Sequence, residues 1–126
     1  MDSFVSIPEV GELYMGEVIA WYDGPRLFAL TKKDSHNVLF LAYWIGDYKK
    51  DDKSFESYMI IPASNKRVDD YNSGLIDFFD LLNIPNEQNI YRLDDYYGVE
   101  DVRIERMTQE SVNKIKLPKK GMFIKD

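Results

Sequence analysis

The chain has 126 residues, with 16 lysines and arginines against 22 aspartates and glutamates, so its formal net charge is −6. It has no cysteine and a single histidine, which excludes disulfides, thiolate nucleophiles and zinc sites built on sulfur or several imidazoles. Excess negative charge disfavours binding to nucleic acid and anionic lipid, because like charges repel. The length is typical of one domain, and we expect residues 1–126 to form a single globular domain.

The start of the chain has neither the basic residues nor the apolar segment of a secretory signal peptide. The longest apolar run, Val38 to Ile45, is far shorter than the roughly 20 residues of a transmembrane helix. We therefore expect a cytoplasmic protein that does not bind a membrane.

The first half of the sequence predicts antiparallel strands joined by polar turns. Aromatic, β-branched and alternating apolar residues predict strands at four places: 13–22, 26–31, 38–45 and 55–61. The first turn, Asp23-Gly24-Pro25, combines a residue of free φ with one that lacks a backbone donor. The charged segment 49–53 predicts a loop. Because short turns join consecutive strands, we expect a meander.

The second half predicts two short helices followed by two strands. Ser64 is a candidate N-cap, and Gly74 is placed to end that helix in the left-handed conformation. Asp77 resembles the start of a capping box for a second helix. Further strands are expected at 90–93 and 102–107. The sequence thus predicts an α+β fold: one antiparallel sheet of about six strands, with two short helices packed on one side.

The single histidine, His36, lies beside Asp34 and Ser35 in the segment 33–37. A histidine near serine and aspartate has the residue types of a nucleophilic triad or of a general base. Triad members normally converge from distant segments, however, whereas Asp, Ser and Asn are typical turn residues. We interpret this segment as a turn.

Four pairs of adjacent carboxylates occur in the chain: Asp51-Asp52, Asp69-Asp70, Asp94-Asp95 and Glu100-Asp101. Paired carboxylates can perform acid–base chemistry or bind a divalent cation. Neighbouring residues of a strand point to opposite faces, however, so such pairs rarely converge on one atom. We interpret them as solvated surface, and we expect neither a metal nor a cofactor.

One segment mixes acids with tyrosines and is the predicted partner-binding site: Asp94, Asp95, Tyr96, Tyr97, Glu100 and Asp101. Carboxylates and aromatic ring faces both bind guanidinium groups, so this composition suits an arginine-rich surface. The alternative is a turn whose tyrosines pack against the edge of the sheet.

A second candidate site is an aromatic pocket formed by Trp21, Tyr22, Tyr43 and Trp44, with His36 or carboxylates as acid and base. Large aromatic residues in strands usually belong to the core or pack across strands, which is the alternative interpretation. Fully buried rings would argue against a pocket, and a concave, partly exposed cluster would favour one.

Several short segments together resemble a family of small bacterial domains of uncharacterised function. They include the sequence from Tyr22 to Phe28, the strand from Phe40 to Trp44, and the segment from Tyr58 to Pro62. The ending from Leu117-Pro118 to Gly121-Met122-Phe123-Ile124 is also similar. The resemblance implies a bacterial origin, cellular or phage, and a stand-alone domain, and it supplies no catalytic residues.

The leading hypothesis is a non-enzymatic protein that binds a basic protein partner through its acidic and aromatic surface, as an immunity protein, antitoxin or inhibitor does. The alternative is a small-ligand-binding domain or hydrolase that uses carboxylates beside the aromatic pocket. An acidic mimic of nucleic acid ranks lower, because basic residues are interspersed among the acids. The oligomeric state stays open.

Overall fold

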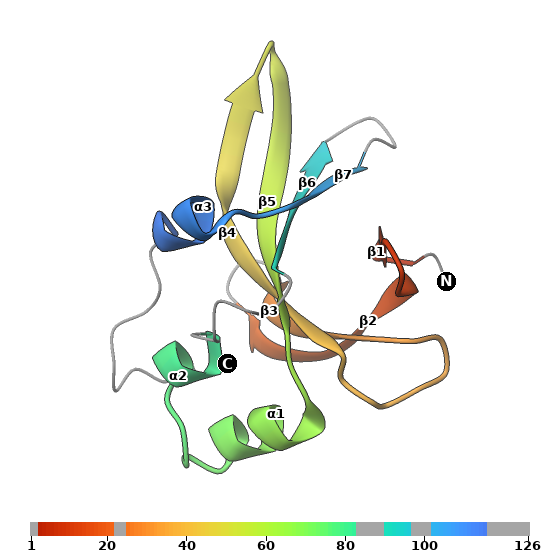
Figure 1. Ribbon diagram of the computed structural model, residues 1–126, viewed down its shortest axis with the longest axis vertical. Helices are drawn as coiled ribbons and strands as arrows, with labels where there is room; N and C mark the ends of the chain where they lie inside the picture. Colours follow the sequence, from red (N-terminus) through yellow and green to blue (C-terminus); the bar gives the residue numbers. More distant parts are fainter. Residues whose placement is uncertain (1–2, 22–24, 83–89, 97–101, 116–126) are drawn as a thin grey trace.

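The computed structural model describes residues 3–21, 25–82, 90–96 and 102–115, and an antiparallel sheet dominates it (Figure 1). Within these residues seven strands pair in sequence order: β1 (Val5–Ile7), β2 (Gly11–Trp21), β3 (Pro25–Thr31), β4 (Phe40–Lys50), β5 (Lys53–Pro62), β6 (Tyr91–Tyr96) and β7 (Val102–Arg106). Three short helices accompany them: α1 (Asn65–Asn72), α2 (Phe78–Leu82) and α3 (Gln109–Asn113). The predicted meander is confirmed.

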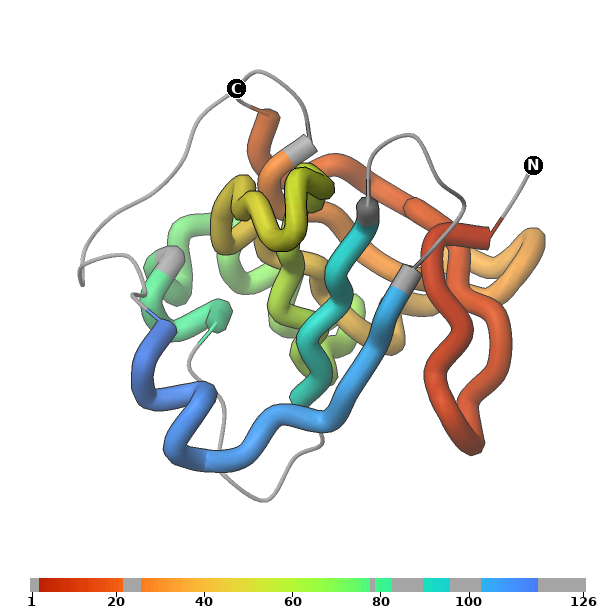
Figure 2. The backbone as a smooth tube through the Cα atoms, turned by 90° about the horizontal axis from the view of Figure 1, so that it is seen from above, coloured from red at the N-terminus to blue at the C-terminus, as the bar shows by residue number. Residues whose placement is uncertain are grey.

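The predicted fold class, an α+β domain with about six strands and two helices on one side of the sheet, is wrong. The described chain is mostly antiparallel β, and its seven-stranded sheet curves into a nearly closed barrel (Figure 2). The edge strands approach each other, since Pro8 after β1 and Ile104 of β7 line one cavity. Strand β1 and helix α3 were not predicted from the sequence. Strand β1 has only three residues, and helix α3 has five, none of them buried.

The charged segment 49–53 is a tight hairpin turn within two long strands. Pairing of β4 with β5 continues to Lys50 and Lys53, so Asp51 and Asp52 alone connect the strands. Both have positive φ, 52° and 63°, as in the type I′ turn that matches strand twist. Aspartate tolerates this conformation better than most residues. The hairpin therefore extends well beyond the neighbouring strands, at the top of Figure 1.

The sheet separates two apolar clusters, because successive strand residues point to opposite faces. Leu41 belongs to the cluster that contains Leu81 of α2, and this cluster also includes buried residues of α1. Ala42 belongs to the other cluster, which contains Leu13 of β2 and buried residues of β1. The apolar run in β4 is therefore covered on both faces, by one cluster on each side.

The predicted helix starts are confirmed in both cases. The Ser64 hydroxyl accepts a hydrogen bond from the Arg67 backbone N–H at 3.4 Å. The Asp77 carboxylate accepts one from the Asp80 N–H at 2.8 Å, which caps α2. Gly74 follows α1 with a φ of 80°, the left-handed value that favours glycine. Short-range capping chemistry therefore sets the starts of both helices and the end of α1.

The turn predicted at 23–25 falls mainly outside the described residues, which resume at Pro25, the first residue of β3. The C-terminal ending, 116–126, also lies outside them. Among the helices that the structure describes, none has the length and apolar character needed to span a membrane.

Candidate functional site

Asp94 and Asp95 belong to β6, and the strand places their side chains on opposite faces of the sheet. In the register with β5, Asp94 lies opposite Ser57 and Asp95 lies opposite Glu56. The segment was predicted to be a connection, but its first three residues extend β6 instead. The two neighbouring carboxylates consequently have different surroundings.

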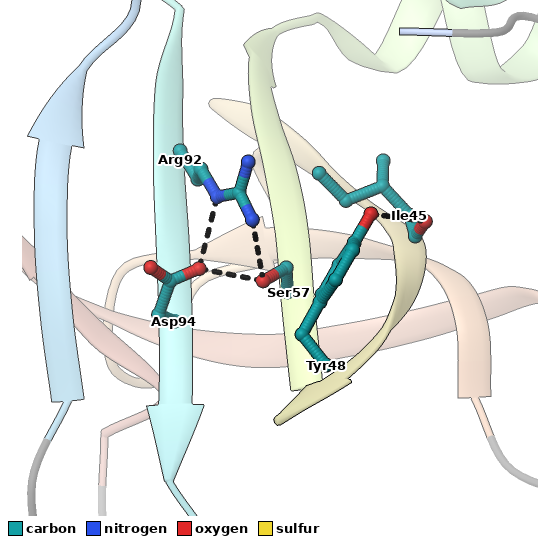
Figure 3. Close-up of polar contacts among 5 residues, drawn as sticks. All are labelled: Ile45, Tyr48, Ser57, Arg92 and Asp94. Atoms are coloured by element: carbon teal, nitrogen blue, oxygen red, sulfur yellow. Dashed lines mark hydrogen bonds and ion pairs between the residues drawn. The ribbon is translucent and has the colours of Figure 1, made fainter. Parts of the chain in front are cut away.

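Asp94 is bound within the sheet by two donors (Figure 3). The Ser57 hydroxyl donates to Asp94 Oδ1 at 2.6 Å, and Arg92 Nε donates to the same oxygen at 3.0 Å. Arg92 Nη2 also donates to Ser57 Oγ at 3.2 Å. Since Ser57 is fully buried, this triangle is shielded from water on one side. Its hydrogen bonds hold Arg92 and Asp94 in fixed orientations.

Aromatic rings border the same triangle. The Arg92 guanidinium lies 5.3 Å from the centre of the Tyr48 ring, a cation–π contact. Tyr48 stacks on Phe55 with ring centroids 5.7 Å apart. A groove of about 760 Å³ adjoins these side chains, and it is lined by Lys50, Phe55, Arg92, Asp94, Arg103, Ile104 and Glu105. Three cations and two carboxylates line this groove, so this face of β6 is mixed in charge.

The opposite face carries a pair of carboxylates, Glu56 and Asp95, on adjacent strands. Residues directly opposite each other in a sheet have Cβ atoms about 4.5–5.5 Å apart, so like charges there repel. Arg26 Nη1 lies 3.7 Å from Glu56 Oε1. The same guanidinium lies over the Trp44 ring, 4.0 Å from its centre. We call Arg26, Trp44, Glu56 and Asp95 the carboxylate cluster.

The surroundings of Asp95 favour its protonated form. Partial burial raises the pKa of Asp95 above its usual value, and the Glu56 carboxylate raises it further. Burial also raises the pKa of Tyr58, whose hydroxyl donates to Glu56 Oε2 at 3.4 Å. The cluster contains two carboxylates and one arginine, so an additional positive charge beside Asp95 would stabilise the ionised pair.

Residues 1–126 match a family of unknown function, DUF6575, along the whole chain. The chain belongs to this family. No curated protein and no solved structure matches it. Membership of DUF6575 agrees with the predicted resemblance to an uncharacterised family, whereas the individual motifs and the bacterial origin stay predictions.

In this DUF6575 chain the aromatic residues predicted to form a pocket do not share one face. Tyr43 packs against the cluster that contains α1 and α2, and burial raises its pKa. Its neighbour Trp44 packs against the other cluster. Trp21 is 56% exposed at the end of β2, and Tyr22 lies outside the described residues. The alternation rule that separates Asp94 from Asp95 separates Tyr43 from Trp44 as well.

His36 lies in the connection between β3 and β4, as predicted, and its backbone carbonyl accepts a hydrogen bond from Asn65 Nδ2 at 3.2 Å. The Ser35 N–H donates to the Lys32 carbonyl at 3.2 Å, which closes the polar turn. The Ser35 hydroxyl accepts from the Asn37 N–H at 3.1 Å. His36 lines a separate cleft beside α1.

The remaining residues of the predicted partner-binding segment are only partly described. Tyr96 pairs with Phe55 through its backbone position, and its side chain lies outside the described part. Tyr97, Glu100 and Asp101 also lie outside it. No group of three or more His, Asp or Glu side chains in the described ranges is placed to hold a metal ion.

Four residues of these two sites were missed by sequence reasoning: Arg26, Glu56, Ser57 and Arg92. Glu56, Ser57 and Arg92 are the polar residues of the strands predicted at 55–61 and 90–93, and this interruption of an apolar run is the signal that marks them. That signal identifies the residues individually, but their pairing with Asp94 and Asp95 depends on strand register.

Proposed function

We propose that this chain is a non-enzymatic, cytoplasmic interaction protein that binds a basic side chain of a protein partner at the carboxylate cluster. The observation that carries the proposal is the cross-strand pair of Glu56 and Asp95, in which burial and mutual repulsion disfavour ionisation of Asp95. A guanidinium beside this pair replaces repulsion with two charge-assisted hydrogen bonds. An immunity, antitoxin or inhibitor role is the narrower form of the proposal.

Arginine suits this cluster better than lysine. Its planar guanidinium binds carboxylates with two parallel hydrogen bonds and stacks on aromatic rings. Arg26 already contacts both kinds of group, since its Nη1 lies 3.7 Å from Glu56 Oε1 and its guanidinium lies over the face of Trp44. A partner arginine beside Asp95 would pair with this carboxylate as Arg26 pairs with Glu56. The net charge of −6 would attract such a partner over long range, so association should slow as salt rises.

We expect a synthetic peptide containing several arginines to bind the protein, and Asp95→Asn to weaken this binding on the order of tenfold. Fluorescence anisotropy of the labelled peptide at low and high salt measures the effect. A peptide with citrulline at every arginine position is the neutral control, because it keeps the shape and loses the charge.

Asp94→Asn is the matched variant for this experiment, since it removes the neighbouring charge from the other face of β6. We expect Asp94→Asn to weaken binding much less than Asp95→Asn, because Asp94 is already bound by Arg92 and Ser57. Equal binding of the citrulline peptide would overturn the proposal. So would an equal effect of the two variants, because the attraction would then depend on net charge alone.

The same carboxylate pair favours the second candidate, a small-ligand-binding or hydrolytic site. A carboxyl of raised pKa beside a second carboxyl is the arrangement of a general acid and its partner. This candidate requires aromatic side chains that line one pocket, but Tyr43 and Trp44 lie on opposite faces of the sheet. The interaction role needs one partly exposed carboxylate face and no such enclosure.

A further inference from the structure

A second polar cleft lies at the other end of β3 from the carboxylate cluster. Arg26 stands near the start of β3, whereas Ala29 and Thr31 at its end line this cleft. The cleft has a volume of about 210 Å³ and adjoins β2, the connection before β4, and α1, which lies at the bottom of Figure 1. It is smaller than the roughly 300–1,000 Å³ pockets of drug-sized ligands, and this size suits one side chain.

The cleft combines an apolar part with a polar part. Ala29 and Val68 are almost fully buried and, with Val38, provide the apolar lining. Glu17 from β2 and Asp69 from α1 provide two carboxylates. The lining contains no lysine or arginine in the part of the chain that the structure describes. On α1 the Lys66 ammonium pairs with Asp70, at 2.8 Å, and leaves the neighbouring Asp69 on the cleft.

A β-bulge shapes one wall. Met15 pairs with Leu30 and Val18 pairs with Phe28, so Gly16 and Glu17 together lie opposite the single residue between them on β3. A bulge interrupts the ladder and redirects a side chain, which explains how Glu17 of β2 comes to line the cleft.

Glycine at position 16 keeps this wall open. A Cβ atom there would stand 3.3 Å from Thr31 Cγ2 and 3.6 Å from Ala29 Cβ, both of which belong to cleft-lining residues. A methyl group at this position would therefore take up space inside the cleft without changing its charge.

We propose that this cleft binds a primary ammonium group on a short aliphatic chain, the chemistry of a lysine side chain. The methylene groups contact the apolar lining, and the ammonium group lies between the Glu17 and Asp69 carboxylates. The first turn of α1 has fewer donors for a competing anion, because the Ser64 hydroxyl caps the Arg67 N–H and Asn65 Nδ2 donates to the His36 carbonyl at 3.2 Å. This site is separate from the carboxylate cluster and does not depend on its proposed role.

The test is a titration of the isotope-labelled protein, followed by backbone amide NMR, with Nα-acetyl-lysine methylamide and with n-butylamine. We expect saturable shifts at the amides of cleft residues for both probes, and none for the Nε-acetylated lysine, which lacks the charge. Shifts with n-butylamine alone would overturn the assignment to lysine and leave a site for free amines.

Three variants define the site. Glu17→Gln and Asp69→Asn should each weaken binding on the order of tenfold. Gly16→Ala should also weaken it, although it removes no charge. Asp34→Asn is the matched control, because Asp34 is an exposed carboxylate of the neighbouring turn that does not line the cleft, and asparagine tolerates its φ of 58°.

Glu17 is exposed, so Glu17→Gln remains informative if Gly16→Ala fails to fold. Amide shifts that do not saturate would overturn the proposal. So would an equal loss of probe binding in Asp34→Asn and Glu17→Gln. Shifts confined to the amides around Glu56 and Asp95 would also overturn it, and they would leave the proposed function intact.

Discussion

Replacement of Phe28 by alanine is expected to lower the free energy of unfolding by about 3–5 kcal/mol. Phe28 is fully buried on β3, and its ring centroid lies 4.9 Å from that of Phe4 and 5.8 Å from that of Tyr58, in edge-to-face geometry. The substitution removes these aromatic contacts and leaves a cavity in the apolar cluster that contains Leu13 and Ala42. Urea unfolding followed by circular dichroism measures the loss.

Two variants calibrate this result. Phe28→Leu keeps most of the apolar volume and should lower the free energy of unfolding clearly less than the alanine variant does. Leu75→Ala removes a side chain that is 75% exposed, and it should change stability by less than about 0.5 kcal/mol. A loss of stability below about 1 kcal/mol for Phe28→Ala would contradict the packing of Phe28 in the apolar cluster that contains Leu13 and Ala42.

Replacement of Asp94 by alanine is expected to lower the free energy of unfolding by about 1.5–3 kcal/mol, the range for hydrogen bonds to charged groups. The change leaves the buried Ser57 hydroxyl and the partly buried Arg92 guanidinium without their shared acceptor. A double-mutant cycle with Arg92→Met measures the coupling. The double variant should lose less stability than the two single variants lose in sum, because each single change already breaks the shared contact.

The exposed pair of Glu110 and Lys114, 3.7 Å apart on α3, is the control for this cycle. Glu110→Ala should change stability by less than about 0.5 kcal/mol. Strictly additive losses at Arg92 and Asp94 would contradict the hydrogen-bonded triangle.

Local chemistry made the helix starts and most strands predictable. Ser64, Gly74 and Asp77 act on groups within a few residues, so the sequence around each is sufficient to place it. The curvature of the sheet and the pairing of β1 are non-local, because they depend on how distant strands pack. The charged segment 49–53 was interpreted as a loop, because charged residues are uncommon in strands. In the structure, strand pairing continues through Lys50 and Lys53 on both sides of Asp51 and Asp52.

The candidate site was predictable in part for the same reason. Asp95 was named from composition, but its neighbour Glu56 becomes visible only when the register of β5 and β6 is known. The alternation rule was applied to the carboxylate pairs and not to Tyr43 and Trp44, although both sets lie on strands. Applied to all of them, it predicts that the aromatic pair is divided between two faces.

The most direct test of the proposed function is the pKa of the Asp95 carboxyl, followed by carbon-13 NMR of its side chain as the pH is varied. In the free protein we expect a pKa above the usual 3.8, because burial and Glu56 both disfavour the charged form. At saturating arginine peptide this pKa should fall, since a guanidinium beside the carboxylate favours ionisation. A pKa that the bound peptide leaves unchanged would contradict binding of a basic side chain at this cluster.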